Sequence, residues 1–204
     1  EDKKERYIDY IAKELEILAK HLDASRLVSQ MHFGGGTPTF FNASQLERIL
    51  GLIKHYFKNF SDDAEISCEI DPRFLNQEQL DVLIKHGFNR ISYGVQDFNA
   101  DVQKAIHRIQ PFEVTQDVVK MAKDAGIKSI NMDLIYGLPY QTFESFQETL
   151  ALTVKLDPSR LAVFNYAHVP WMKKHQQILE KKGLPSPDEK MEMFLASRKV
   201  MLEE

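Results

Sequence analysis

Residues 127–154, IKSINMDLIYGLPYQTFESFQETLALTV, contain one complete strand, loop and helix. The apolar run that ends at Ile135 predicts a buried strand, and the Gly-Leu-Pro turn after it predicts a loop. Thr142 then opens a helix with apolar side chains at helical spacing, namely Phe146, Leu150 and Val154. A strand followed by an amphipathic helix is the repeating unit of parallel α/β folds.

The same unit recurs along the chain. Five strands are predicted, at Leu27–Phe33, Ala64–Ile70, Asn89–Gln96, Ile127–Ile135 and Arg160–Ala167. The intervals between successive strands leave room for a crossover helix each time, so we expect an α/β fold with a parallel sheet.

Helix signals support this reading. Asn42 with Gln45, and Asn76 with Gln79, have the spacing of capping boxes. The first segment predicts a helix with no strand before it, with an apolar stripe of Ile8, Ile11, Leu15, Leu18 and Leu22. We expect a partial barrel over residues 1–170, a helical segment over 171–204 with helices near 173–182 and from about Asp188, and truncation at both ends.

Composition narrows the function classes. A net charge of -4 makes nucleic acid an unexpected partner. No apolar run reaches the roughly 18 residues of a membrane span, and the charged start is unlike a secretory signal, so we expect a cytoplasmic protein. The single cysteine, Cys68, excludes an internal disulfide and a cysteine-only metal site, and its place on an apolar strand face predicts a core residue.

Polar side chains share one face near the carboxyl ends of four predicted strands. Alternation places them together on each strand: Ser67, Glu69 and Asp71; Ser92, Gly94 and Gln96; Asn131 and Asp133; Asn165 and Ala167. Ligands of parallel barrels bind where these strand ends converge. Mutual hydrogen bonding across the interior is the alternative for any one residue, but the whole set favours a polar ligand.

A triglycine adds a second signal. Phe33-Gly34-Gly35-Gly36-Thr37-Pro38 directly follows a predicted strand, so the backbone there can approach a ligand without a Cβ in the way. It is neither a Walker loop nor a GxGxxG dinucleotide site. His32, just before it, has the simpler reading of a satisfied core or interior histidine.

Five ordered motifs carry a resemblance to a known family. GGGTPTFFN, EISCEIDPR, RISYGVQDFN, INMDLIYGLPYQT and VFNYAHVPW follow one another along essentially the whole chain. The set resembles oxygen-independent coproporphyrinogen III oxidase, a family of radical S-adenosylmethionine (radical SAM) enzymes. The resemblance implies a partial TIM-like barrel, the radical SAM core. Haem-chaperone-like relatives share some motifs but have GVQSF where this chain has GVQDF.

The resemblance also implies cofactors and site residues. Two SAM molecules and a 4Fe–4S cluster are expected, with the cluster ligands outside this chain because its CxxxCxxC loop is absent from the sequence. Gly35 and Glu69 match the contacts of the cluster-bound SAM. The contacts of the second molecule match Gly36, Thr37, Gln96, Arg108, Asp133 and Ala167. From the residues alone, Arg108 would instead be a surface arginine.

The implied reaction is oxidative decarboxylation of coproporphyrinogen III to protoporphyrinogen IX by a 5′-deoxyadenosyl radical, on the anaerobic route of haem biosynthesis. We expect an external electron donor, a monomer, and no turnover from this stretch alone. A haem-binding transfer protein of the same superfamily is the alternative. A metal-free barrel enzyme that uses Glu69 or Asp133 as acid and base is a third possibility, for which the sequence offers no phosphate or sugar site.

Overall fold

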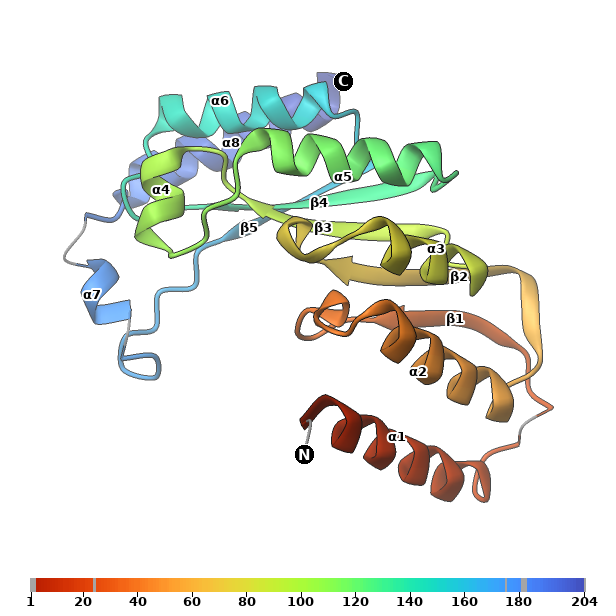
Figure 1. Ribbon diagram of the computed structural model, residues 1–204. Helices are drawn as coiled ribbons and strands as arrows, with labels where there is room; N and C mark the ends of the chain where they lie inside the picture. Colours follow the sequence, from red (N-terminus) through yellow and green to blue (C-terminus); the bar gives the residue numbers. More distant parts are fainter. Residues whose placement is uncertain (1–2, 24, 175, 181–182, 204) are drawn as a thin grey trace. The chain divides into compact units, whose positions relative to one another are not determined.

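The computed structural model describes residues 3–23, 25–174, 176–180 and 183–203. Five strands alternate with helices along the chain (Figure 1). The strands are β1 (Val28–Phe33), β2 (Phe60–Ile70), β3 (Arg90–Gln96), β4 (Ser129–Tyr136) and β5 (Arg160–Asn165). The α-helices are α1 (Lys3–Ala19), α2 (Ala43–Tyr56), α3 (Gln77–Lys85), α4 (Ala100–Ala105), α5 (Phe112–Asp124), α6 (Phe143–Lys155), α7 (Gln176–Glu180) and α8 (Pro187–Glu203). Short 3-10 turns, η1 (Pro38–Phe40) and η2 (Pro72–Phe74), follow β1 and β2.

The five strands form one sheet in the order β1-β2-β3-β4-β5. β1 pairs with β2, and β4 with β5, in parallel register. All five predicted strands are therefore present. The last one ends at Asn165 rather than at Ala167, because its partner β4 ends at Tyr136, which pairs with Asn165. The sequential order follows from one helical crossover between each pair of neighbouring strands.

The chain divides into two compact units, Glu1–Ile91 with Met121–Lys128, and Ser92–Lys120 with Ser129–Glu204. Each unit is described by itself. The predicted boundary near residue 170, where the strand–helix pattern of the sequence changes, stays a prediction.

In the first unit, α1 packs against α2 and α2 against α3. Both predicted capping boxes are present, at Asn42 with Gln45 and at Asn76 with Gln79. The buried core includes Ile8, Leu46, Leu50, Leu80 and Leu83. The expected stripe of α1 is only partly buried: Ile8 is in the core, whereas Leu18 and Leu22 are exposed, and Leu22 lies beyond the end of the helix.

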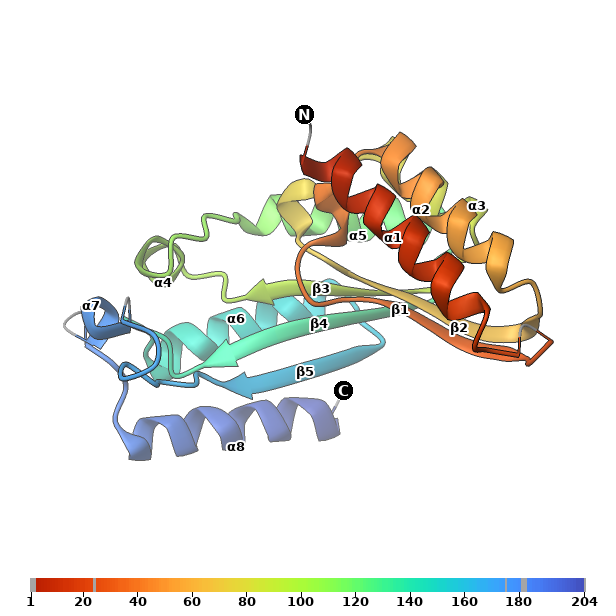
Figure 2. The same cartoon turned by 90° about the horizontal axis from the view of Figure 1, so that it is seen from below.

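In the second unit, α8 packs against α6 and lies beside β5, as Figure 2 also shows. The largest buried side chains of this unit are Tyr93, Phe146, Ile130, Met132, Leu134 and Leu138. Ser186 and Glu189 bond each other's backbone N–H groups at the start of α8, and Pro187 occupies the first helical position. This capping box explains why the last helix begins there.

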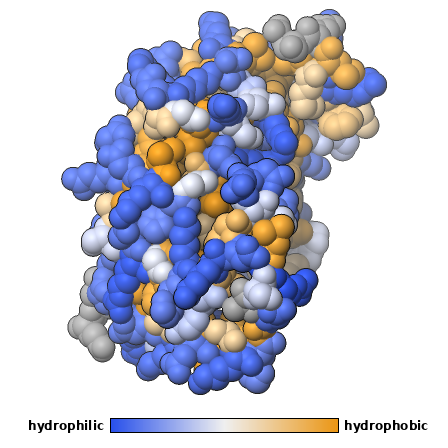
Figure 3. Space-filling model, turned by 90° about the vertical axis from the view of Figure 1, so that its right-hand side faces the viewer, coloured by the Kyte–Doolittle hydropathy of each residue, from blue (hydrophilic) through white to orange (hydrophobic). Residues whose placement is uncertain are grey.

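Hydrophilic atoms cover most of the face drawn in Figure 3, with hydrophobic atoms visible between them. Among the described residues, the helices are too short or too polar to cross a membrane.

Candidate functional site

The predicted alternation of polar and apolar residues is clearest on β3. Ile91, Tyr93 and Val95 are buried, and the residues between them are partly exposed. Strand β4 follows the same rule at its centre, where Met132 and Leu134 are buried and Asp133 between them is partly exposed. The edge strand β5 differs, because Phe164 and Asn165 on opposite faces are both exposed.

In the first unit, three polar side chains meet beside the triglycine; we call them the β1–β2 cluster: His32, Ser67 and Glu69. Parallel pairing sets His32 beside Ser67, and its Nδ1 lies 2.8 Å from the Ser67 Oγ. Its Nε2 lies 3.4 Å from Oε1 of Glu69. The other carboxylate oxygen of Glu69 accepts a hydrogen bond from the backbone N–H of Gly35 at 3.1 Å. The cluster therefore connects the glycine loop to β2.

This arrangement favours glycine at two of the three positions of the triglycine. Gly35 has a φ of +96°, which side-chain-bearing residues rarely adopt. A Cβ on Gly34 would lie 2.5 Å from the His32 Nε2 and 3.0 Å from the Glu69 Oε1. Gly36 faces open space, and Thr37 follows as the N-cap of η1 without a side-chain capping bond. Two of the three glycines thus have a definite steric or conformational reason.

The β1–β2 cluster keeps free capacity for a ligand. The side chain of Glu69 is 46% exposed and that of His32 is 55% exposed. A carboxylate has about four acceptor positions, so Glu69 can accept from a ligand ammonium or hydroxyl in addition to Gly35. Glu69 and Gly35 were predicted as site residues, whereas His32 was expected to be a satisfied core or interior histidine. That expectation is wrong, because the His32 side chain is exposed. The signal that it missed was the parallel register, which a single sequence does not reveal.

In the second unit, Ser92, Asn131 and Asp133 form a closed hydrogen-bonded triangle across β3 and β4. The Ser92 hydroxyl donates to Asp133 at 3.0 Å, and the Asn131 amide donates to both Ser92 and Asp133 at 2.7 Å. Mutual hydrogen bonding, the alternative considered for single residues, therefore holds for these three. Asp133 remains partly exposed, which leaves it able to meet a ligand as well.

Gln96 and Arg108 lie together over Gly94. The Arg108 Nη2 donates to the Gly94 carbonyl at 2.8 Å. A Cβ on Gly94 would lie 2.9 Å from the Gln96 Nε2 and 3.1 Å from that Arg108 nitrogen. The expectation of a surface arginine is thus wrong: Arg108 is half-buried and folds back onto β3. Its guanidinium lies beside an amide, an arrangement that suits recognition of a carboxylate.

The remaining predicted site residue, Ala167, lies exposed in the loop after β5. Gln176, which is buried, donates to the Ala167 carbonyl at 3.0 Å and accepts from the Val169 N–H at 2.6 Å. The loop is therefore held by a glutamine that sequence reasoning had not singled out.

Two residues near these clusters have structural roles. Asp71 was expected on the polar face of β2, but it is buried just after the strand, and its carboxylate bonds the guanidinium of Arg73. Cys68 is fully buried, as predicted, and burial together with the neighbouring charge of Glu69 raises the pKa of its thiol to about 12. Within the described ranges, no three His, Cys, Asp or Glu side chains form a group that could hold a metal ion.

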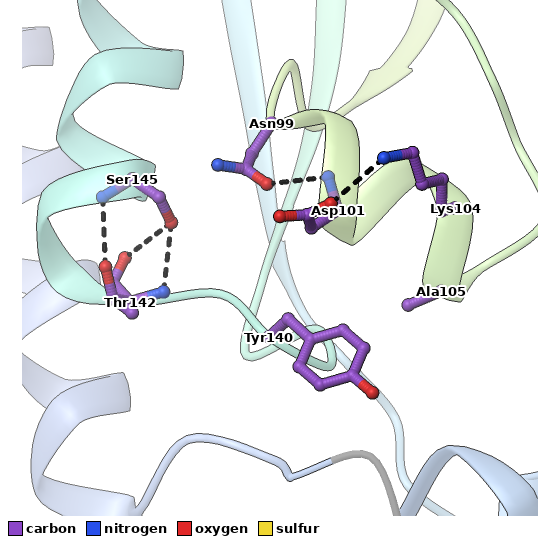
Figure 4. Close-up of a pocket in the computed structure, with 7 residues that line it drawn as sticks. All are labelled: Asn99, Asp101, Lys104, Ala105, Tyr140, Thr142 and Ser145. Atoms are coloured by element: carbon purple, nitrogen blue, oxygen red, sulfur yellow. Dashed lines mark hydrogen bonds and ion pairs between the residues drawn. The ribbon is translucent and has the colours of Figure 1, made fainter.

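A hollow of about 490 Å³ lies between the starts of α4 and α6 (Figure 4). Its lining residues are Asn99, Asp101, Lys104, Ala105, Tyr140, Thr142 and Ser145. Many of their polar groups already bond one another: Asn99 caps α4, Lys104 pairs with Asp101, and Thr142 forms a capping box with Ser145. This hollow is therefore a weaker candidate than the strand-end clusters.

Comparisons with known proteins identify the superfamily of this chain. The sequence model of the radical SAM superfamily matches residues 2–153. The chain is 58% identical over 194 residues to an oxygen-independent coproporphyrinogen III oxidase of Helicobacter pylori, and 45% identical over 192 residues to the protein of that name from Escherichia coli. These matches cover 95% and 94% of this chain but only 42% of each relative.

Solved structures give the same assignment. The chain superimposes on coproporphyrinogen III oxidase from Escherichia coli, a radical SAM enzyme, with a TM-score of 0.93 and 43% identity, over 98% of this chain and 46% of the other. Elp3 from Methanocaldococcus infernus shares the fold alone, with a TM-score of 0.68 and 15% identity over 94% of this chain and 49% of that one. The expected fold class is thereby confirmed. The matched model covers most of the chain, and the chain therefore belongs to the radical SAM superfamily.

Proposed function

We propose that this chain is the SAM-binding part of an oxygen-independent coproporphyrinogen III oxidase. In this proposal the whole protein converts coproporphyrinogen III to protoporphyrinogen IX by oxidative decarboxylation of two propionate groups. The support is identity of 58% and 45% to proteins of that name along nearly all of this chain. Because the chain spans about 42% of their length, the activity belongs to the whole protein.

Membership of the superfamily implies SAM and a 4Fe–4S cluster. The observation that carries the proposal is the Glu69 carboxylate held against the Gly35 N–H beside a backbone without Cβ atoms. SAM has an ammonium and a carboxylate on its methionine part and hydroxyls on its ribose. A half-exposed carboxylate can accept from the ammonium or the hydroxyls, and a glycine backbone can approach them closely.

Further SAM contacts are proposed within each unit. Gly36 and Thr37 extend the glycine loop beside Gly35. In the second unit, Arg108 and Gln96 offer donors to a carboxylate, and Asp133 can accept from hydroxyls. Ala167 is an exposed residue in the loop after β5. We propose two SAM molecules per active site, in line with the family resemblance.

The cluster ligands are proposed to lie outside this chain. Cys68 is fully buried and its thiol pKa is about 12, so it does not present a thiolate to iron. When bound, SAM would supply the radical chemistry that removes hydrogen from a propionate side chain. The residues named here would hold and orient SAM and keep its charged groups paired.

The test uses the whole protein with its cluster reconstituted under anaerobic conditions. We expect SAM-dependent loss of coproporphyrinogen III and formation of protoporphyrinogen IX. Glu69→Gln should weaken SAM binding by about tenfold or more, because an ionised acceptor becomes a neutral amide. Glu65→Gln is the matched control: it changes the same residue type on the same strand, where Glu65 pairs with Arg90 instead.

Equal SAM affinity in the Glu69→Gln and Glu65→Gln proteins would contradict the assignment of Glu69. Tight haem binding without consumption of coproporphyrinogen would contradict the oxidase and fit a haem-transfer protein.

The same proposal includes an external electron donor, a monomeric state and a cytoplasmic location. Residues 1–170 are proposed as the barrel segment and 171–204 as a helical extension from it. Size measurement of the whole protein by light scattering tests the oligomeric state.

A further inference from the structure

We propose that Asp97 is a positioning residue, which holds Gln96 in the conformation that contacts SAM. This inference rests on the proposed function, because it gives Gln96 a role in SAM binding. Asp97 itself is fully buried, so in this proposal it acts through Gln96.

The backbone at Gln96 is unusual. Gln96 is the last residue of β3, and its φ of +69° lies in the left-handed region that favours glycine. The N–H of Asp97 donates to the carbonyl of Val95 at 2.9 Å. A bond from residue i+2 back to residue i closes a three-residue turn centred on Gln96, and with positive φ this turn is rare and strained. Such a turn persists only when its surroundings hold it.

The turn also fixes the direction of the Gln96 side chain. Its amide lies over Gly94, beside the guanidinium of Arg108. A relaxed backbone at Gln96 would rotate its Cα–Cβ bond and carry the amide away from Arg108. The pairing of these two donors therefore depends on the strained turn.

Asp97 is the residue that holds the turn. One carboxylate oxygen accepts from the Asn99 N–H at 2.6 Å and from the Thr149 hydroxyl at 3.1 Å. The other oxygen accepts from the side-chain amide of Gln141. The carbonyl of Asp97 accepts from Gln103 at 2.9 Å, and the backbone carbonyl of that glutamine accepts from the Arg108 N–H at 2.9 Å.

Gln141 extends the connection to β4. Its amide donates to the carbonyl of Ile135 at 3.0 Å, and its oxygen accepts from the N–H groups of Gly137 and Leu138. Every polar atom of this side chain is thus in use. An asparagine at position 97 would set its NH₂ group against a donor in either orientation, against the Gln141 amide or against the Asn99 N–H. A flip of Gln141 to relieve the first would break its bonds to the loop.

The test measures SAM affinity in the whole protein with its cluster reconstituted, as a double-mutant cycle. Asp97→Asn should weaken SAM binding about tenfold when Gln96 is present, and less than about twofold when Gln96 is replaced by alanine. A role in stability alone would not produce this dependence on Gln96. Thr153→Val is the matched control, because Thr153 is buried one turn further along α6 and its hydroxyl donates to the Thr149 carbonyl.

Rescue provides a second readout. Asp97→Asn combined with Gln141→Glu restores a donor–acceptor pair of reversed polarity and keeps one negative charge, so it should recover part of the lost affinity. Recovery should be incomplete, because a carboxylate at position 141 cannot donate to the Ile135 carbonyl. If the Asp97→Asn protein does not fold, Thr149→Val removes one donor to Asp97, together with the acceptor of the Phe98 N–H. It should weaken SAM binding in the same direction, again only with Gln96 present.

The possible outcomes distinguish failure of the proposed function from failure of the role given to Asp97. If the unsubstituted protein binds no SAM, the proposed function fails and this inference fails with it. If it binds SAM and Asp97→Asn has no effect, or the same effect with and without Gln96, only the role of Asp97 is refuted.

Discussion

Two carboxylates near the carboxyl ends of neighbouring strands have opposite surroundings. Glu69, at the end of β2, is nearly half exposed and has one backbone donor and a loosely placed histidine. Asp97, just after β3, is fully buried and has three donors. Unused acceptor capacity at Glu69 suits a ligand, whereas the satisfied carboxylate of Asp97 suits a structural connection. The proposals made here thus give the same chemical group a binding role in one region and a positioning role in the other.

The largest expected effect is on the free energy of unfolding, which should fall much more for a substitution beside Asp97 than for one at Glu69. Gln141→Ala should lower the free energy of unfolding by about 4 kcal/mol, because it leaves Asp97 and two loop N–H groups short of partners and opens a cavity. Glu69→Ala should change it by less than about 0.5 kcal/mol, since its side chain is half exposed. Urea unfolding measures both. Similar losses of unfolding free energy in the two variants would contradict the difference between the surroundings of Asp97 and Glu69.

The next effect is the pH dependence of stability. Burial raises the pKa of Asp97 to about 6, above the ordinary value of 3.8, although its hydrogen bonds from Gln141, Asn99 and Thr149 act to lower it. Because the folded-state pKa is raised, the stabilising contribution of the protonated form is complete below pH 3.8 and is lost as the pH rises through 6. The full change is about 3 kcal/mol.

Urea unfolding between pH 4 and pH 7.5 tests this dependence. Asp97→Asn should remove it, and Glu69→Gln should retain it. A pH profile of Asp97→Asn that matches the unsubstituted protein would show that another group titrates.

A smaller effect concerns binding rather than folding. Gly94→Ala places a methyl group against the ends of the Gln96 and Arg108 side chains. Because these ends are flexible, we expect a stability loss below about 1 kcal/mol but SAM binding about tenfold weaker in the reconstituted whole protein. Calorimetric titration with SAM measures the affinity. Unchanged affinity would show that SAM binding does not depend on the observed positions of Gln96 and Arg108.

The smallest expected effect is that of a control substitution, Gly51→Ala. Gly51 lies inside α2, and a Cβ there would meet nothing within 4 Å. Gly51→Ala should raise the free energy of unfolding by about 0.5–1 kcal/mol, because alanine has the higher helix propensity, and SAM binding should not change. Weaker SAM binding in this variant would mean that the Gly94 result reflects a general effect of added side chains.

Much of the architecture was predictable because its signals are local. Capping boxes, apolar spacing and glycine turns depend on residues that are close in sequence, so the five strands and both predicted capping boxes were found within a few residues. The capping box at Ser186 was present in the sequence but was not used.

The sequence alone determined the order of strands and helices, the polar faces of β3 and β4, and the residues that match the radical SAM motifs. Only the tertiary structure decided which polar side chains stay open to a ligand. Asp71 and Asp97 became buried and fully engaged, whereas His32 joined Glu69 at the surface. Burial and partners are set by parallel register and loop packing between residues far apart in the chain, and periodicity along one strand carries no information about either.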